Sequence, residues 1–238
     1  MSTPLLAIDR VTKRFSGLTA LHNLSMAVRV GETHGLMGPN GAGKTTLTSV
    51  ICGAYRPQGG SIRFEGQDIT GLAPHKVCRL GIARTHQIPQ PFTHLTVHQN
   101  VAVSAMYGND TRKSKAMAEA DKVLEIVDLV AKRDVRAADL DALALKRLEL
   151  ARALATNPKL LLIDETAAGL SDMEIPRFLE ILSRIRSLGI TYLMIEHVMK
   201  VMLQAVERVT VIDGGAKLAE GTPAEVMKDE KVIGAYLG

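Results

Sequence analysis

The stretch from Gly38 to Thr46 has the residue types and the spacing of a phosphate-binding loop. It reads GPNGAGKTT and fits the pattern G-x-x-x-x-G-K-[ST] at every fixed position. Its glycines let backbone N–H groups converge on an anion, and a helix beginning after the loop would add its partial positive charge. We expect Lys44 to reach the β- and γ-phosphates of a nucleotide and Thr45 to bind Mg²⁺, with Thr46 on the α-phosphate side. The expected nucleotide contacts in this loop are Gly38, Asn40, Gly41, Ala42, Gly43, Lys44, Thr45 and Thr46.

Two other interpretations of this loop are weaker. A glycine-rich turn with an unrelated lysine would not need the full pattern between an expected strand and an expected helix. A dinucleotide-binding loop would need a third glycine, which GAGKTT lacks.

Acidic residues form a second candidate site after the apolar run at 159–164. An acid at the carboxyl end of a buried parallel strand lies at the edge of the sheet where ligands bind. Asp164 is therefore placed to hold Mg²⁺ through water, and Glu165 to orient or deprotonate an attacking water. His197 follows the apolar run 190–196 and is a candidate for a hydrogen bond to the γ-phosphate. The plainer alternatives are a solvated strand end and a structural histidine.

The elements that must position these side chains alternate between strands and helices. Short apolar or alternating runs predict strands, and helical periodicity predicts helices between them. The expected strands lie at 5–12, 24–30, 33–38, 61–69 (a hairpin turning near 65–66), 81–86, 159–164, 190–196, 208–213 and 216–221. One expected helix begins at 44 and ends at Gly53. The others lie at 74–80, 113–130, 173–189, 198–205 and 222–238, with Pro223 at the start of the last one.

This order of elements predicts an α/β fold. We expect a P-loop NTPase core with a mostly parallel sheet and an N-terminal antiparallel β portion. The whole chain, 1–238, is expected to form one domain, and 89–155 contains no good strand, so it is predicted to be an inserted helical subdomain. Of the 238 residues, 46% are apolar but only 3% are aromatic, so the core must be aliphatic.

Composition excludes several classes of protein. The net charge of +4 is spread along the chain without a long run of one sign, so no nucleic-acid arm is expected. Cys52 and Cys78 form neither a metal-type pair nor a disulfide framework, which favours a reduced, cytosolic setting. The start of the chain lacks a signal peptide, and no run of about 18 apolar residues could span a bilayer. The chain could still sit on a membrane by docking to a protein that spans it.

Together these features resemble the nucleotide-binding subunit of an ABC transporter, from about residue 5 to the end. Phe15, in TKRFSGLTAL, matches the aromatic residue that stacks on adenine in this family. Gln87, in ARTHQ, matches the glutamine that contacts Mg²⁺ or the water and senses the membrane partner. AGLSD at 168–172 matches the D-loop, and KRLELARAL matches the helix after the signature motif.

The resemblance implies a mechanism and a set of partners. ATP would bind between two subunits packed head to tail, touching the phosphate loop of one and the signature motif of the other. Closure and hydrolysis would drive a membrane permease, whose coupling helix would enter a groove around 87–97 with Pro91 and Phe92 exposed. The chain would then lie peripherally on the cytoplasmic face of the inner membrane and work only indirectly with a solute-binding protein.

Within the family, three stretches indicate a subfamily. The chain is most similar to the ATPases of branched-chain amino-acid uptake in the segment around the phosphate loop, in GIARTHQ and in the terminal VIGAYLG. Similar ATPases serve urea, amides, aromatic acids and lipopolysaccharide export. The alternatives are a non-transport ABC ATPase that acts as a soluble factor, and a regulatory one that hydrolyses ATP slowly.

Asp141 departs from the family pattern. Aligning KRLELARAL backwards places the signature, usually L-S-G-G-Q, over 140–144, which here reads LDALA. Aspartate is a good helix N-cap, but a carboxylate beside a triphosphate repels it. Two interpretations stay open: Asp141 is only a cap, or the chain offers its neighbour a poor signature and works best in a heterodimer with a second ATPase subunit. Smaller departures are His86, where the subfamily often has Phe, and Thr166, where Pro is common.

Overall fold

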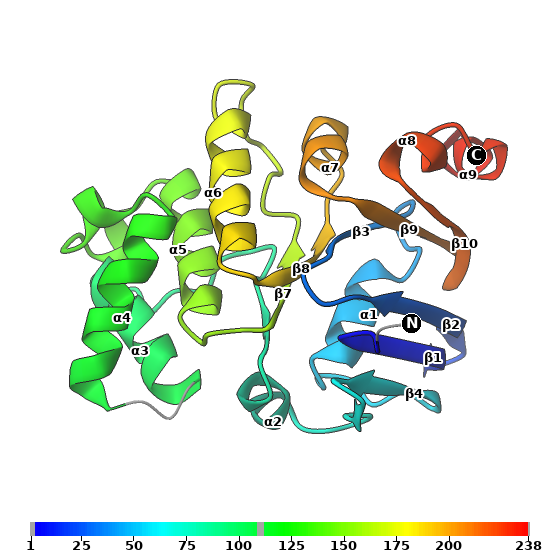
Figure 1. Ribbon diagram of the computed structural model, residues 1–238, viewed down its shortest axis with the longest axis horizontal. Helices are drawn as coiled ribbons and strands as arrows, with labels where there is room; N and C mark the ends of the chain where they lie inside the picture. The colour runs from blue at the N-terminus through cyan, green and yellow to red at the C-terminus, as the bar shows by residue number, and fades with distance from the viewer. Residues whose placement is uncertain (1–2, 109–111, 238) are drawn as a thin grey trace. The chain divides into compact units, whose positions relative to one another are not determined.

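The computed structural model describes residues 3–108 and 112–237, and the chain divides into two compact units. The first unit comprises Met1–Val77 and Thr191–Gly238, and the second comprises Cys78–Ile190. Both units combine strands with helices, as the order of elements predicts (Figure 1). The predicted subdomain at 89–155 lies inside the second unit, and its boundaries stay a prediction.

The first unit begins with an antiparallel sheet in the order β2-β1-β4-β5. Its strands are β1 (Leu6–Phe15), β2 (Leu18–Val28), β4 (Gly59–Phe64) and β5 (Gln67–Asp68). The N-terminal antiparallel portion is thus confirmed, but β1 runs further than predicted and β2 begins earlier. The reason is the tight turn at Ser16 and Gly17, whose φ angles of 38° and 96° are those of a hairpin that keeps both strands paired to its tip. The predicted turn at Glu65 and Gly66 is also present, with φ angles of 50° and 80°.

The second sheet of this unit is mostly parallel. Its strands, β3 (Thr33–Met37), β8 (Thr191–Ile195), β9 (Arg208–Asp213) and β10 (Ala216–Gly221), lie in the order β10-β9-β3-β8. Strand β3 runs parallel to both β8 and β9, and every residue of β3 and β8 is buried. Continuous burial of this kind is typical of parallel strands that are covered on both faces, and in β3 it includes the polar side chains of Thr33 and His34.

The helices of the first unit follow the predicted positions, with one difference at the C-terminus. They are α1 (Lys44–Ile51), α7 (Met199–Ala205), α8 (Pro223–Val226) and α9 (Glu230–Leu237), while α2 (Pro74–Arg79) crosses the boundary between the units. The tail forms two helices rather than one. Thr222 and Glu225 form a capping box that starts α8 at Pro223, and the helix ends after a single turn. Figure 1 shows α8 and α9 in red beside β10, against which both pack.

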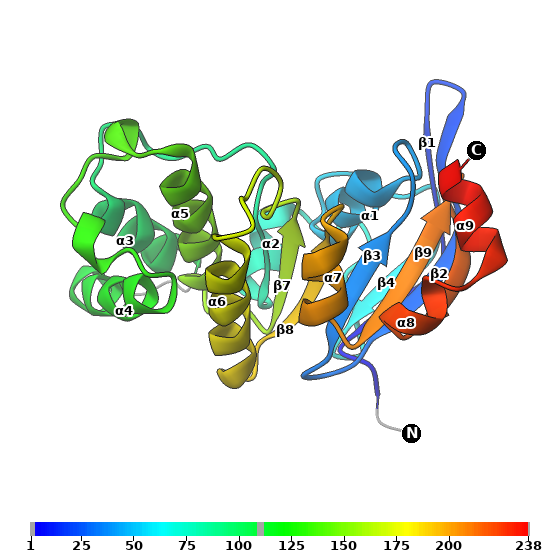
Figure 2. The same cartoon turned by 90° about the horizontal axis from the view of Figure 1, so that it is seen from above.

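The second unit is dominated by helices. Its helices are α3 (Val97–Gly108), α4 (Lys113–Ile126), α5 (Ala142–Leu154) and α6 (Ile175–Ser187), with short 3₁₀ turns η1 (Val130–Lys132) and η2 (Ala137–Asp139). Helices α3, α4 and α5 lie side by side in both views, and small buried side chains such as Ala105, Ala120 and Ala151 allow their close packing (Figures 1 and 2). Strands β6 (Ile82–Arg84) and β7 (Leu160–Asp164) are parallel neighbours. The predicted helix at 113–130 ends early, because Asp128 takes a left-handed conformation with φ 56°.

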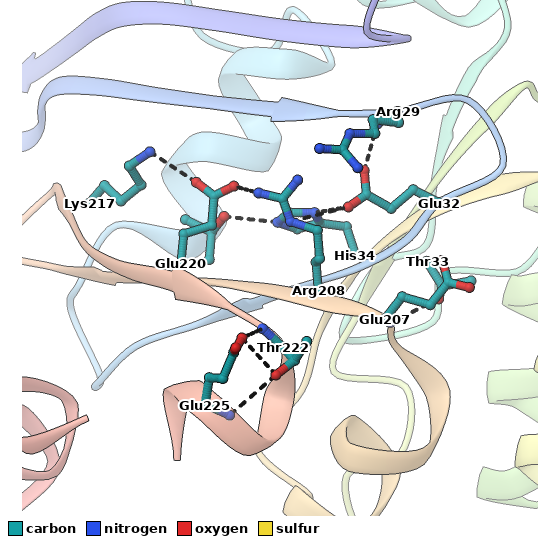
Figure 3. A network of polar contacts seen from close by, with 11 residues as sticks. Arg29, Glu32, Thr33, His34, Glu207, Arg208, Lys217, Glu220, Thr222 and Glu225 are labelled. Carbon is teal, nitrogen blue, oxygen red and sulfur yellow. Dashed lines mark hydrogen bonds and ion pairs between the residues drawn. The ribbon is translucent and has the colours of Figure 1, made fainter. Parts of the chain in front are cut away.

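A polar network lies at the start of β3 in the first unit (Figure 3). The buried His34 accepts or donates a hydrogen bond at each ring nitrogen, to Glu32 at 3.3 Å and to Thr210 at 2.8 Å. Glu32 also accepts a hydrogen bond from the Arg29 N–H at 2.7 Å and lies 3.6 Å from Arg208. Burial raises the pKa of Glu32, but the hydrogen bonds from His34 and Arg29 bring that pKa below its ordinary value. The network therefore stabilises the carboxylate form of Glu32.

Candidate functional site

The phosphate loop follows β3 directly, as its sequence pattern predicts. Gly38 and Gly43 have φ angles of 152° and 104°, and a Cβ on Gly38 would lie 2.1 Å from the carbonyl oxygen of Ile212. These positions therefore require glycine for reasons of space and of backbone conformation. Helix α1 begins at Lys44, so its N-terminal N–H groups lie at the end of the loop.

Lys44 is fixed against the backbone of its own loop. Its Nζ donates to the carbonyl oxygens of Gly38 at 2.7 Å and Pro39 at 2.9 Å, and the residue is 6% exposed. Asn40, Gly41 and Thr45 are exposed, while Ala42 is buried and Gly43 and Thr46 are half-buried. The loop thus combines a held ammonium group with exposed backbone and hydroxyl groups, which is the arrangement that binds phosphate.

Phe15 belongs to an aromatic pair that sequence analysis did not find. Its ring meets the ring of Tyr55 edge to face, with centroids 5.1 Å apart and an interplanar angle of 78°. The ammonium of Lys13 lies 4.7 Å from the Phe15 centroid and donates to the carbonyl oxygen of Arg56 at 3.0 Å. Both rings are partly exposed, and because their planes differ by 78° a planar base can stack on the Phe15 ring but not across both rings.

His197 lies in the bend between β8 and α7 and is exposed. In the parallel pairing, Ile195 of β8 is opposite Leu36 of β3. Because Leu36 comes two residues before Gly38 and Ile195 two residues before His197, His197 and the phosphate loop leave the sheet at the same edge. The histidine is thus at the edge where sequence analysis expects it.

The acid pair lies in the second unit, at the end of β7. Asp164 is 3% exposed and accepts a hydrogen bond from Arg84 Nη2 on β6 at 2.7 Å. Its backbone N–H donates to the Thr85 hydroxyl at 3.0 Å, and that hydroxyl lies 3.5 Å from the hydroxyl of Thr166. Thr166 therefore takes part in the local hydrogen bonding where the family often has proline. Arg84 is a partner of Asp164 that no sequence pattern pointed to.

Two of the expected catalytic residues contact each other. Gln87 donates a hydrogen bond from Nε2 to the carboxylate of Glu165. Glu165 has a φ angle of 47°, which is uncommon for a residue with a side chain and is typical of functional sites. The backbone at Glu165 is therefore held in a strained conformation while Gln87 holds its carboxylate.

The donor chemistry fits a magnesium ion bound mainly by a substrate. Thr45, Gln87 and Asp164 offer a hydroxyl, an amide oxygen and a carboxylate, which are the oxygen donors that Mg²⁺ prefers. Across residues 3–108 and 112–237, no three His, Cys, Asp or Glu side chains cluster as a metal site of their own. An ion held by Thr45 in the first unit, or by Gln87 and Asp164 in the second, would therefore depend on phosphate oxygens for much of its coordination.

Asp141 is the N-cap of α5, as predicted. Its Oδ1 accepts a hydrogen bond from the Ala144 N–H at 2.7 Å, and its Oδ2 accepts one from Lys132. The Lys132 ammonium, followed by the Ala144 N–H, holds the pKa of Asp141 below its ordinary value. Asp141, at the N-terminus of α5, is therefore an ionised carboxylate with Lys132 beside it. The sequence pattern did not predict this lysine.

A buried carboxylate fastens the segment around Gln87 to α5. Glu149 is 6% exposed, and it accepts hydrogen bonds from His86 Nδ1 at 2.7 Å and Arg152 Nη1 at 2.9 Å. Arg152 also donates to the carbonyl oxygen of Gln90 at 2.7 Å, and its guanidinium lies 5.3 Å from the centroid of the Phe92 ring. Burial raises the pKa of Glu149, but the His86 hydrogen bond and the Arg152 charge bring that pKa below its ordinary value.

The segment 87–97, which is expected to receive a helix of the permease, is exposed at only one of the two positions named for it. Phe92 is 48% exposed, but Pro91 is half-buried, so the expectation that both are exposed is wrong for Pro91. Arg152 of α5 donates a hydrogen bond to the carbonyl oxygen of Gln90, the residue before Pro91, so this part of the segment is held against α5. Ile88, at 74% exposed, is the apolar side chain that sequence analysis missed.

Comparison with known proteins identifies the family. Residues 21–168 match the model of the ABC transporter family, and residues 216–238 match that of the branched-chain amino acid ATP-binding cassette transporter. The chain is 37% identical over 253 aligned residues to the high-affinity branched-chain amino acid transport ATP-binding protein BraF of Pseudomonas aeruginosa, covering 100% of this chain and 99% of the relative. The corresponding protein LivG of Salmonella typhimurium is 36% identical with the same coverage.

Solved structures agree with this assignment. The ADP conformation of MJ1267, an ATP-binding cassette of an ABC transporter, superposes with a TM-score of 0.87 at 30% identity, covering 100% of both chains. A nucleotide-free ATP-binding cassette gives a TM-score of 0.88 at 30% identity over 99% of this chain and 100% of the other. The chain therefore belongs to the ABC transporter family, and it is an ABC-type ATPase subunit.

Proposed function

We propose that the chain cleaves ATP to ADP and phosphate to power a membrane importer of branched-chain amino acids or similar small organic solutes. The observation that carries the nucleotide part is the phosphate loop, with Lys44 held on the carbonyl oxygens of Gly38 and Pro39 at 2.7 and 2.9 Å. The solute class is supported by full-length relatives that are named for branched-chain amino acid transport. The chain as a whole, 1–238, would be one ATPase domain, with 89–155 as its helical subdomain.

Each expected site residue has a role in this reaction. The loop amides and Lys44 bind the phosphates, and the adenine stacks on the Phe15 ring, which Tyr55 supports. Glu165, held by Gln87, orients and deprotonates the water that attacks the γ-phosphorus. The bond from the γ-phosphorus to the β–γ bridging oxygen then breaks, and its electrons leave with ADP. His197 donates a hydrogen bond to the γ-phosphate as charge develops there.

Mg²⁺ would be held by Thr45, Asp164 and Gln87 together with the phosphates. When bound, it would neutralise the charge of the β- and γ-phosphate oxygens. The chain's own contribution is to keep these donors in place: Arg84 and Thr85 fix Asp164, and α1 fixes Thr45.

The partners follow from the same scheme. The exposed Ile88 and Phe92, with the backbone fastened to α5, would receive a helix of a membrane permease. No helix within the described residues has the length and apolar character of a membrane span. As the ATPase subunit of a membrane transporter, the chain would attach peripherally at the cytoplasmic face of the membrane. Because Asp141 is an ionised carboxylate, a heterodimer with a second ATPase subunit that offers an uncharged signature is favoured.

Two substitutions test the nucleotide part. Lys44→Ala should abolish measurable binding of MgATP in equilibrium dialysis, because the loop loses its charge. Glu165→Gln should keep binding but lose hydrolysis in a phosphate-release assay. Lys228→Ala, an exposed lysine on the tail, is the matched control and should behave as the native chain does. Nucleotide affinity that survives Lys44→Ala would refute the assignment of the loop.

The solute is tested with the complete transporter. The chain is co-purified with its membrane subunits, reconstituted in vesicles, and assayed for ATP-dependent uptake of radiolabelled leucine and, in parallel, of urea. Uptake of leucine supports branched-chain amino acids as the solute, whereas uptake of urea alone would contradict that assignment. Failure to co-purify with any membrane protein would contradict the transport role itself.

A further inference from the structure

The C-terminal helix contacts the phosphate loop. The backbone N–H of Gly38 donates a hydrogen bond to the hydroxyl of Tyr236, on α9, at 2.8 Å. The carbonyl oxygen of the same glycine accepts a hydrogen bond from Lys44 Nζ at 2.7 Å. The two ends of one residue therefore connect the C-terminal helix to the phosphate-binding lysine, across 198 residues of sequence.

Few other contacts can fix the backbone of Gly38. Its φ angle of 152° and the carbonyl oxygen of Ile212, 2.1 Å from where a Cβ would be, prevent a side chain from fixing it. The following residue, Pro39, has no N–H to donate, so the Gly38 N–H is the last backbone donor before Asn40. Pro39 nevertheless supplies the second carbonyl oxygen that Lys44 uses, at 2.9 Å. The Pro39 carbonyl oxygen also accepts a hydrogen bond from the Ala42 N–H at 3.2 Å, so the carbonyl group whose orientation depends most on the Gly38 N–H is that of Gly38 itself.

Helix α9 is held well enough to act as this anchor. It packs against β10, and its Val232 is only 3% exposed. Partial burial raises the pKa of Tyr236, so the phenol stays protonated at neutral pH and its oxygen accepts the Gly38 N–H as a neutral group.

We propose that Tyr236 is a positioning residue for the nucleotide, acting through Gly38 on Lys44. The hydroxyl holds Gly38 so that its carbonyl oxygen keeps the Lys44 ammonium where the β- and γ-phosphates bind. This role rests on the nucleotide binding proposed above, and it makes the C-terminal helix part of the nucleotide site. Loss of the hydroxyl leaves the loop less ordered before binding, so the cost of ordering it appears as weaker nucleotide affinity.

Tyr236→Phe tests this role with the smallest possible change. The full-length chain is titrated with MgADP, which is not hydrolysed, by isothermal titration calorimetry. We expect the Kd of Tyr236→Phe to rise about three- to tenfold, the size of one lost neutral hydrogen bond, with unchanged stoichiometry. Tyr107→Phe, on a tyrosine that is 75% exposed on α3, is the matched control and should leave the Kd unchanged. Amide hydrogen exchange at Gly38 should also become faster in Tyr236→Phe alone.

Stoichiometry separates this role from a merely structural one. A variant that only misfolds would show fewer binding sites at an unchanged Kd, and that result would overturn the positioning role, as would a native Kd at native stoichiometry. A chain ending after Asp229, which lacks α9, should show the same or a larger rise in Kd. If the native chain itself binds no MgADP, the nucleotide binding fails first and the role of Tyr236 falls with it.

Discussion

Glu149→Gln isolates the electrostatic part of the link between α5 and the segment around Gln87. The substitution keeps the shape of the side chain but removes a buried charge that pairs with Arg152 at 2.9 Å and His86 at 2.7 Å. The Arg152 side chain is 20% exposed, so its charged hydrogen bond is worth roughly 1.5–3 kcal/mol. His86 is 60% exposed, and solvent screening reduces its share to about 0–1 kcal/mol. We therefore expect the free energy of unfolding at pH 7 to fall by about 2–3 kcal/mol.

The assay is urea unfolding followed by circular dichroism, at several pH values. Glu119→Gln is the matched control, because Glu119 pairs with the exposed Lys122 at 3.1 Å on a helix surface and should cost no more than about 0.5 kcal/mol. Since the pKa of Glu149 lies below its ordinary 4.5, its stabilisation is complete above that pH and is lost as the pH falls through the lower, folded-state pKa. The gap between the native chain and Glu149→Gln should therefore narrow as the pH falls below about 4.5.

Two results would refute this reasoning. A cost at pH 7 no larger than that of Glu119→Gln would mean that the buried charge contributes nothing beyond a surface pair. A gap that fails to narrow below about pH 4.5 would mean that the folded state does not hold Glu149 as a carboxylate, contrary to the contacts with His86 and Arg152.

Three further substitutions test other parts of the structure. Asp141→Ser should raise the ATPase rate of the assembled transporter about fivefold, the effect of one charge at about 4 Å in water, while Asp139→Ser should not; an unchanged rate would favour Asp141 as a mere cap. Glu32→Gln should lower the urea midpoint at pH 7 and by less at pH 4, because burial raises the pKa of Glu32 but His34 and Arg29 bring it below its ordinary value; an equal loss at both pH values would contradict this. Gly38→Ala should lower the Tm more than Gly31→Ala, since both have positive φ but only the Cβ at 38 meets a backbone oxygen, at 2.1 Å; equal losses would show that the contact relaxes.

The phosphate loop and the acid pair were predictable because their chemistry is local. The loop from Gly38 to Thr46 needs glycines, a lysine and a helix start within nine positions, and Asp164 and Glu165 need only a buried strand before them. Strand ends were harder to place, since the extent of β1 and β2 depends on a turn whose residues, Ser16 and Gly17, carry a weak signal.

The supporting contacts were not predictable, because they join residues that only the fold brings together. His86 and Glu149 are 63 residues apart in sequence, and Arg84 and Asp164 are 80 apart. In each case the residue type is common and its position unremarkable until the neighbouring helix or strand is known. Tyr55 illustrates the same limit, since a tyrosine after a helix gives no sign that its ring supports Phe15.

The pairing of Asp141 with Lys132 changes how the unusual signature should act on a partner's nucleotide. A bare carboxylate would repel a triphosphate, but Lys132 supplies a compensating charge within hydrogen-bonding distance. The pair is nearly neutral as seen from a distance, so long-range repulsion is weak. At close range the lysine is directed to Asp141, and the Asp141 Oδ1 already accepts the Ala144 N–H at 2.7 Å. An N–H donor of the helix start is thus engaged by the cap instead of being offered to a phosphate. Asymmetry between the two sites of a dimer would then come from the close-range charge of Asp141 together with a donor in use, and not from long-range repulsion.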